Sequence, residues 1–213
     1  MQAHAYKETM TDLREKILDV TAAVYADAGY RGTTTRRIAA EAGVNEVTLF
    51  RHFGSKDELI KAALKREHAR MISASPDLDA ADPALALEQW ALDMHARFHS
   101  HSALIRQLLG DAAERPDLVA LDPCDDAGSE AKAIIGWLAA LQRNGRLGAE
   151  GDAFIAGHML VNTLFTDALW RDHMPPDHAP PVAIVVRRMV AFTLRGLGYT
   201  GALPALPSVS EAA

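Results

Sequence analysis

The sequence predicts an all-α protein, in which a small N-terminal helical unit precedes a larger helical bundle. Apolar residues recur at spacings of three and four through most of the 213 residues, and no alternation typical of a strand lasts more than a few positions. Glycine and proline clusters divide this pattern into segments of helix length. The expected boundaries are 1–72 for the first unit, 73–200 for the second and 201–213 for a flexible tail.

The first unit is expected to begin with one long helix and two short ones. Gly29 ends the long helix, and the short helices over about 35–42 and 45–52 are separated at Gly43. One face of the long helix is defined by residues at helical spacing: Leu13, Ile17, Thr21, Val24 and Ala28.

A further long helix starts at Ser55 and runs to about Ile72. Ser55 and Glu58 form a capping box, which marks its N-terminus. The stretch 73–83 then changes composition and separates the two units. Beyond it, helices are predicted from apolar stripes at Leu87, Trp90, Ala91, Met94 and Phe98, at Leu104, Ile105, Leu108 and Leu109, and at Ile134, Ile135, Leu138 and Leu141.

Composition and charge exclude several classes of protein. Hydrophobic residues make up 49% of the chain and charged residues 23%, which is typical of a folded globular protein. The single cysteine excludes an internal disulfide, and neither a membrane span nor a secretory leader is visible, so a cytoplasmic location is expected. The net charge of −6 argues against general coating of nucleic acid, but residues 31–70 hold 9 basic against 5 acidic side chains. A local polyanion-binding patch is therefore expected there.

Residues 35–52, TRRIAAEAGVNEVTLFRH, form a pattern typical of a helix-turn-helix motif. Gly43 supplies the positive φ of the turn, and Ala39 is small where the second helix approaches the first. Apolar contacts between the two helices would come from Ile38, Ala42, Val44 and Leu49. In this motif the second helix enters the major groove of DNA. A plain helical hairpin needs the same residue types, so the pattern alone leaves both interpretations open.

The run from Leu13 to Leu64 resembles the DNA-binding domain of the tetracycline-repressor (TetR) family. The matching residues, in fixed order, are Ala28-Gly29-Tyr30, Thr33-Thr34-Thr35-x-x-Ile38-Ala39-x-x-Ala42-Gly43-Val44 and Thr48-Leu49-Phe50-x-His52-Phe53-x-Ser55-Lys56-x-Glu58-Leu59. The resemblance implies a dimeric repressor of transcription whose C-terminal domain binds a small molecule that weakens DNA binding. It does not imply which small molecule.

The resemblance also implies a set of DNA-contacting residues: Thr35, Arg36, Asn45, Glu46, Val47, Thr48, Arg51, His52 and Lys56. Thr35 and Lys56 begin helices, where a phosphate complements the helix dipole. Asn45 to Thr48 begin the recognition helix, where base edges are read. For Lys56, a solvated surface position is the alternative interpretation.

Three residues of the recognition helix depart from the family pattern. Many members carry a basic or small residue at the position of Glu46 and glycine at the position of Val47. The carboxylate of Glu46 either shapes specificity or faces away from DNA. Phe50 replaces the commoner tyrosine and is open to interpretation as a core residue, and Phe53 is expected in the core.

Residues 152–171 and 182–197 are expected to form the dimer contact. The first segment is apolar nearly all round, so it must be buried on most sides. Ala153, Ala156 and Gly157 form a strip of small residues that permits close helix approach. The alternative is that both helices are core of a monomer.

A ligand pocket is expected beside His158 and Asn162, which lie four apart within the apolar run 153–170. Its predicted lining consists of Met94, Phe98, Trp137, His158, Met159, Asn162 and Phe165. Two hydrogen-bonded core residues amid ordinary packing are the alternative.

No cofactor, metal or catalytic residue is expected. The chain has no nucleophile elbow, P-loop or dinucleotide fingerprint. His95, His99 and His101 share helical spacing, but no cysteine and only the nearby Asp93 could complete a metal site, so solvated histidines are expected.

The predicted function is a ligand-responsive repressor that binds a pseudo-palindromic operator as a homodimer and is released by a small, mostly apolar effector. The alternative is a small-molecule-binding or scaffold dimer with a weak or non-functional DNA head, favoured only by Glu46. An enzyme built on the C-terminal bundle is a third, more distant hypothesis.

Overall fold

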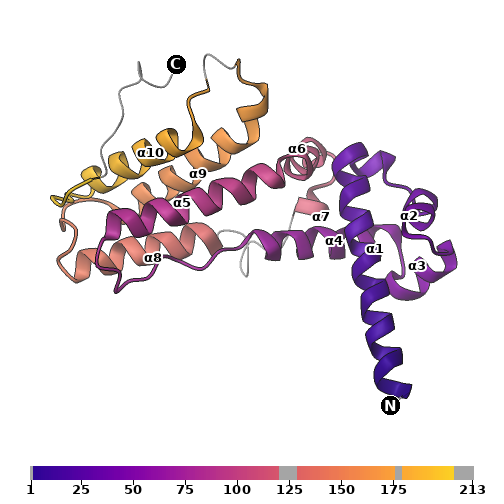
Figure 1. Ribbon diagram of the computed structural model, residues 1–213. Helices are drawn as coiled ribbons and strands as arrows, with labels where there is room; N and C mark the ends of the chain where they lie inside the picture. The colour runs from indigo at the N-terminus through magenta and orange to yellow at the C-terminus, as the bar shows by residue number, and fades with distance from the viewer. Residues whose placement is uncertain (1, 120–128, 176–178, 204–213) are drawn as a thin grey trace. The chain divides into compact units, whose positions relative to one another are not determined.

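The computed structural model describes residues 2–119, 129–175 and 179–203, with side chains over 12–118, 131–175 and 179–203. This part of the chain contains helices and no strand, which confirms the predicted fold class (Figure 1). The elements are α1 (Gln2–Gly32), α2 (Thr35–Ala42), α3 (Glu46–Phe53), α4 (Lys56–Met71), α5 (Pro83–Ser100), α6 (Ser102–Asp111), α7 (Pro116–Val119), α8 (Ser129–Arg143), α9 (Ala153–Trp170), the short 3-10 helix η1 (Arg171–His173) and α10 (Val182–Gly196). Most of the expected tail, residues 204–213, lies outside the described residues.

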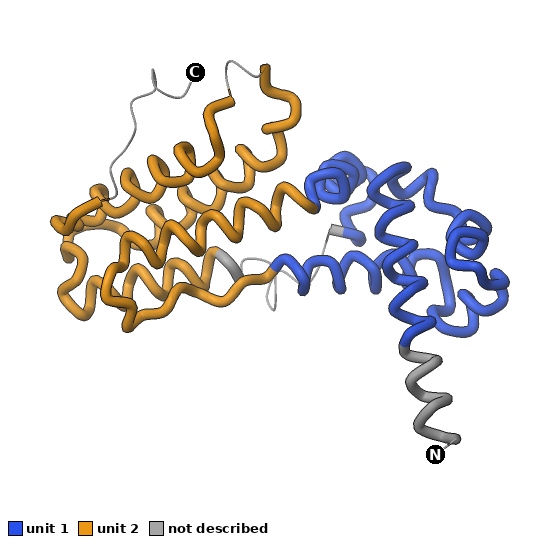
Figure 2. Tube along the Cα trace, viewed as in Figure 1, with its two compact units in different colours: residues 1–71, 101–123 blue, residues 72–100, 124–213 orange. Residues whose placement is uncertain are grey.

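The helices form two compact units (Figure 2). The first contains α1–α4 together with α6 and α7, and the second contains α5, α8, α9 and α10. This division differs from the expected one because residues 101–119 pack with the N-terminal unit instead of the C-terminal bundle. The apolar stripe of α6 packs on one side of α1. A helix that follows α5 in the sequence therefore packs with helices that precede α5.

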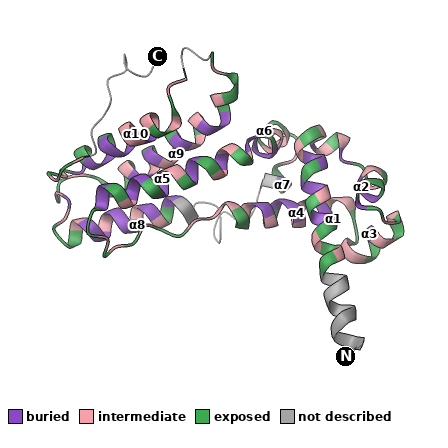
Figure 3. Ribbon diagram, viewed as in Figure 1, coloured by how far each residue is buried: buried purple, intermediate pink, exposed green. Residues whose placement is uncertain are grey.

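The core of the first unit follows from the spacing of apolar residues on α1. Ile17, Thr21 and Val24 are buried, as their helical spacing predicts. Figure 3 shows buried and exposed residues alternating along α1. One side of α1 packs on the helix-turn-helix through a cluster formed by Ile17, Leu18, Ala22, Ile38, Ala39, Ala42, Leu49, Leu59 and Ala63. A second cluster joins α1 and α4 to α6 and α7 and consists of Tyr25, Ile60, Leu64, Leu104 and Leu118.

Gly29 interrupts α1 where the sequence predicts a helix end, although one more turn follows. Its φ of 62° lies in the left-handed region, which disrupts the helical ladder and leaves backbone groups to be satisfied otherwise. Asp111 at the end of α6 accepts hydrogen bonds from the Tyr30 backbone N–H and the Tyr25 hydroxyl, both at 2.8 Å. The backbone N–H that follows the interruption of α1 is therefore bonded by a residue more than 80 positions later in the chain.

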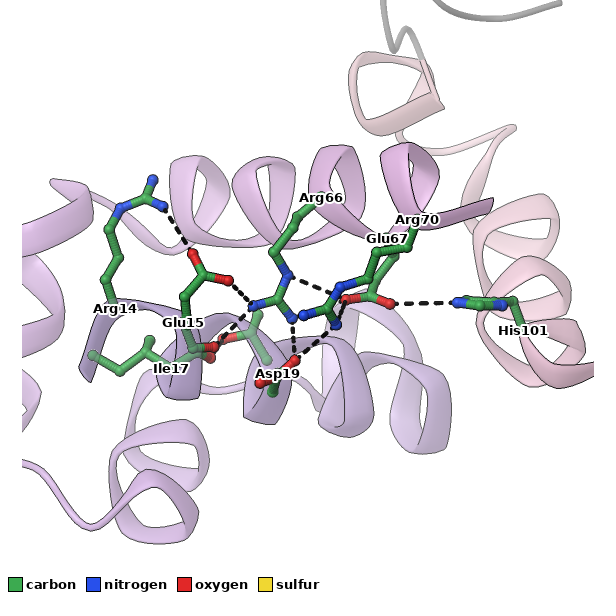
Figure 4. Close-up of polar contacts among 9 residues, drawn as sticks. Arg14, Glu15, Ile17, Asp19, Arg66, Glu67, Arg70 and His101 are labelled. Carbon is green, nitrogen blue, oxygen red and sulfur yellow. Dashed lines mark hydrogen bonds and ion pairs between the residues drawn. The ribbon is translucent and has the colours of Figure 1, made fainter. Parts of the chain in front are cut away.

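Charged side chains join α1, α4 and the residue that precedes α6 (Figure 4). Glu67 of α4 is only 7% exposed and receives hydrogen bonds from Arg66 at 2.8 Å and Arg70 at 3.0 Å, and His101 lies 3.4 Å away. Arg66 also donates to the Glu15 carboxylate and to Asp19 on α1. The buried carboxylate of Glu67 is thus neutralised by cations on its own helix, and the same cations hold α1.

In the second unit, α9 has a buried face and an exposed face. Gly157, Leu160, Leu164 and Ala168 are buried against neighbouring helices, as are Leu87 and Met94 of α5. Phe154, Ile155 and Met159, on the other side of α9, are each at least half exposed, at 57%, 50% and 52%. Within one chain this helix is therefore not buried on most sides as expected, because no described helix covers the side that carries Phe154, Ile155 and Met159.

Gly157 permits the close approach of α8, and its role therefore lies within one chain instead of between two. A Cβ added there would lie 2.6 Å from Ile135 Cγ1 and 3.4 Å from the Ile135 backbone. We expect Gly157→Ala to lower the free energy of unfolding by about 1–3 kcal/mol through overpacking, without changing the oligomeric state. Urea unfolding and sedimentation of the same samples measure both quantities. Unchanged stability would show that α8 relaxes without cost.

Candidate nucleic-acid interface

The helix-turn-helix is fixed by caps at both ends of α2. The Thr34 hydroxyl accepts a hydrogen bond from the Arg37 backbone N–H, at 3.2 Å. Gly43, with a φ of 70°, ends the helix in the left-handed conformation, and the Val44 N–H then reaches the Ala39 carbonyl at 2.9 Å. The glycine at the turn and the small residue beneath it have the roles that the sequence predicts, and α3 follows at once.

The two polar residues at the start of α3 are bonded within the motif. Asn45 is the N-cap, and its side-chain oxygen accepts from the Val47 N–H at 2.9 Å. The Thr35 hydroxyl donates to Glu46 Oε2 at 2.7 Å. Glu46 is therefore held toward the start of α2. The Thr35 hydroxyl, which was expected to contact a phosphate, already has a hydrogen-bond acceptor.

The outer surface of α2 and α3 is cationic and apolar. Arg36 and Arg51 are exposed and form no ion pair with any described residue. Val47 is 72% exposed and Phe50 is 47% exposed. Thr48 and His52 are half-buried. The interpretation of Phe50 as a core residue is wrong; its place three positions after Val47, on the same helix face, is the signal that could have identified it.

Lys56 does not project freely from the start of α4. Its ammonium donates to the Tyr30 carbonyl at 2.7 Å and lies 4.0 Å from the centre of the Tyr30 ring. Burial lowers the pKa of Lys56. Both interpretations from the sequence, a phosphate ligand and a solvated lysine, are therefore incomplete, because this side chain packs on Tyr30 and fastens α4 to the end of α1.

The same tyrosine collects further charges. Its hydroxyl donates to Asp57 at 2.6 Å, and the Arg115 guanidinium lies 3.9 Å from the ring centre and donates to Asp57 at 2.9 Å. These hydrogen bonds, first that from Tyr30, lower the pKa of Asp57 and keep it ionised. The helix that follows the recognition helix is thus oriented by side chains from α1 and from the α6–α7 connection.

The sequence of this helix-turn-helix region matches a known family. Residues 17–63 match the family model described as "Bacterial regulatory proteins, tetR family". The HTH-type transcriptional repressor Rv3405c of Mycobacterium tuberculosis is 32% identical over 136 residues, which cover 62% of this chain and 70% of that protein. This chain belongs to the TetR family. The HTH-type transcriptional repressor KstR of the same organism is 40% identical over 73 residues, which cover 34% of this chain and 33% of KstR.

Solved structures of TetR-type proteins share the whole fold. Salmonella enterica GusR has a TM-score of 0.67 at 18% identity, covering 86% of this chain and 96% of its own. A putative TetR-family regulator from Mesorhizobium loti has a TM-score of 0.65 at 17% identity, covering 88% and 95%. Family membership makes this protein a DNA-binding transcriptional regulator. None of its described helices is long and apolar enough to cross a membrane.

The residues predicted to line a ligand pocket fall into two groups. Met94, Phe98 and Trp137 are buried in the second unit, and Phe165 meets Phe98 edge-on with ring centres 5.3 Å apart. In contrast, the exposed Asn162 and Met159 and the half-buried His158 lie on the outer side of α9. Together with Ile155, Thr163 and Thr166 they border a surface depression of about 420 Å³ that is lined by α9 alone. The expected pocket that combined both groups is therefore wrong, because a helix apolar on all sides does not reveal which side faces inward.

The histidines of α5 are not solvated as expected. His95 is 3% exposed, and its Nε2 lies 2.7 Å from Asp167, a carboxylate that also pairs with Arg171. Burial lowers the pKa of His95 despite this carboxylate, since the charge of Asp167 is shared with Arg171. His99 stacks on His95, with ring centres 6.3 Å apart. No cluster suited to a metal ion occurs among the described residues.

Proposed function

We propose that this protein is a homodimeric repressor that binds a pseudo-palindromic operator and is released by a small, mostly apolar effector, in the cytoplasm. The observation that carries the DNA-binding part is the capped helix-turn-helix, whose second helix exposes Val47 and Phe50. Arg36 and Arg51 of the same motif are exposed and form no ion pair within the described part of the chain. The hydrogen bond from Thr35 to Glu46 weakens the case for a non-functional DNA head, because it draws the carboxylate toward α2.

The proposed dimer contact is formed by the outer faces of α9 and α10. Large apolar side chains are exposed there in the single chain: Phe154, Ile155, Met159 and Phe192. A contiguous exposed apolar surface on two adjacent helices favours association with an equal surface. His158 and Asn162 would then belong to the dimer contact instead of the effector pocket.

The proposed effector site lies among the buried aromatic residues of the second unit. The indole nitrogens of Trp90 and Trp137 are buried without a hydrogen-bond partner in the described part of the chain. A buried donor without a partner is costly, which favours an effector that presents a hydrogen-bond acceptor on an apolar body. The chain passes between the two units after α4 and again before α6, so binding of an effector would act on the DNA-binding helices through these connections.

The test is salt-dependent binding to duplexes selected from a random-sequence library. We expect Arg36→Gln to weaken binding to every sequence and to reduce the slope of log affinity against log salt by about one unit per half-site, because one phosphate contact is lost. Arg143→Gln, an exposed arginine on α8, is the matched control and should leave affinity and slope unchanged. If no duplex is bound by the wild type at any salt concentration, the proposed function is wrong.

A further inference from the structure

We infer that Val47 and Phe50 read the operator through the 5-methyl groups of thymine, so that apolar contact in place of hydrogen bonding sets the central base preference of α3. The inference rests on the proposed function, since it requires α3 to lie in the major groove. It adds the chemical feature that the recognition helix selects.

The first step is that these two side chains are apolar and exposed, and neither belongs to the hydrophobic core. Val47 is 72% exposed and Phe50 is 47% exposed, whereas the adjacent Leu49 is 2% exposed and supplies the contact with α1. Exposed apolar side chains gain nothing from the fold itself. Positions i and i+3 share a face of a helix, so the two present one apolar surface.

The second step is that the two polar side chains that precede Val47 are already engaged. The Asn45 side-chain oxygen caps α3 through the Val47 N–H, and the Glu46 carboxylate accepts from the Thr35 hydroxyl. Either residue would have to give up an existing hydrogen bond before using the same oxygen to read a base edge. Val47 follows these two residues directly and is 72% exposed.

The third step identifies the occupant by charge and chemistry. Arg36 and Arg51 are exposed and have no acidic partner among the described residues, so both guanidinium groups are available to a polyanion. In the major groove, thymine is the base that presents a methyl group. A helix-turn-helix that exposes two apolar side chains on α3 and an arginine on each of its helices therefore fits DNA with thymine opposite Val47 and Phe50.

The experiment removes only the methyl group. Operators selected by the full-length protein are resynthesised with each thymine of the half-site replaced in turn by deoxyuridine, at both symmetry-related positions, and affinities are measured at one salt concentration. Burial of one methyl group corresponds to about 0.8 kcal/mol, or about fourfold in affinity. We expect at least one such pair of replacements to weaken wild-type binding by about fifteenfold, the product of two half-sites.

Substitutions in the protein assign that effect to the two residues. Val47→Ala should reduce the deoxyuridine penalty at one thymine to below about threefold, and Phe50→Ala should do so at a neighbouring thymine. Leu109→Ala is the control, because Leu109 is a 54% exposed leucine on α6, and its penalties should equal those of the wild type.

Two results overturn the inference and leave the proposed function standing. One is sequence-specific binding that is insensitive to every deoxyuridine replacement. The other is a penalty that persists in full in both alanine variants, which would assign the methyl contact to other residues. Absence of binding to any duplex would overturn the proposed function and this inference together.

Discussion

Phe192→Arg is expected to convert the protein into a monomer that binds its operator about a hundredfold more weakly or worse. Phe192 lies on α10, is 71% exposed, and with Ile155 and Met159 borders a depression of about 190 Å³ between α9 and α10. In the proposed dimer this surface is covered by its copy, so a guanidinium there would be buried without a partner, at a cost of several kcal/mol for each ion. Two half-sites can be bound together only by a dimer, so the loss of association is passed on to DNA affinity.

Leu85→Arg is the matched control for this variant. Leu85 lies on α5 and is 48% exposed, so it receives the same charge on another surface of the same unit. Sedimentation velocity should give a dimer for the wild type and for Leu85→Arg and a monomer for Phe192→Arg, with unchanged helix content in all three. A dimeric Phe192→Arg, or a monomeric wild type, would assign the exposed apolar face to some other role.

The helix-turn-helix was predictable from sequence because its determinants are local. The turn glycine, the small residue beneath it and the caps act on neighbours a few positions away, so Gly43 and Ala39 could be assigned from spacing alone. The same holds for the buried face of α1, where one period of apolar residues faces one neighbour.

The second unit was less predictable because its helices are apolar on several sides. In α9 the sequence does not distinguish the side that packs on α8 from the side that carries Met159 and Asn162, since both are compatible with burial. His158 was therefore expected beside Trp137 and lies instead on the outer side. A helix that contacts neighbours in its own chain and is proposed to contact a second copy has no polar face from which to orient it.

The packing of α6 was also out of reach, because its partners are distant in sequence. Asp111 reads as an ordinary surface aspartate, and only the interruption of α1 at Gly29 creates the backbone N–H that it accepts. A polar residue that satisfies a defect elsewhere in the fold leaves no periodic signal near itself. The polar groups of the first unit thus depend on one another more than its apolar spacing indicates, and their energetics can be measured most directly where one cation serves several carboxylates.

Arg66→Met is expected to lower the free energy of unfolding by about 3 kcal/mol, the low end of the range for breaking a buried ion pair. The side chain of Arg66 is 14% exposed, and its guanidinium bonds Glu15, Asp19 and Glu67 (Figure 4). Methionine preserves much of the apolar stem and removes the charge. The Glu67 carboxylate, on a side chain that is 10% exposed, then keeps Arg70 and His101 as its only neighbours of opposite or potential charge among the described residues. The loss is at the low end because Arg70 still donates to that carboxylate.

The double variant Arg66→Met/Glu67→Met should recover most of this loss, because removing both partners leaves no unpaired buried charge. Arg37→Met is the control: Arg37 pairs with Asp27 and Glu41, but all three side chains are more than a third exposed, and exposed pairs contribute about 0–1 kcal/mol. Urea unfolding of all variants at one protein concentration gives the comparison, since a dimer's stability depends on concentration. If Arg66→Met costs no more than Arg37→Met, or if the double variant is less stable than the single one, then α1 and α4 are held by their apolar contacts and the charges at Glu67 contribute no net stability.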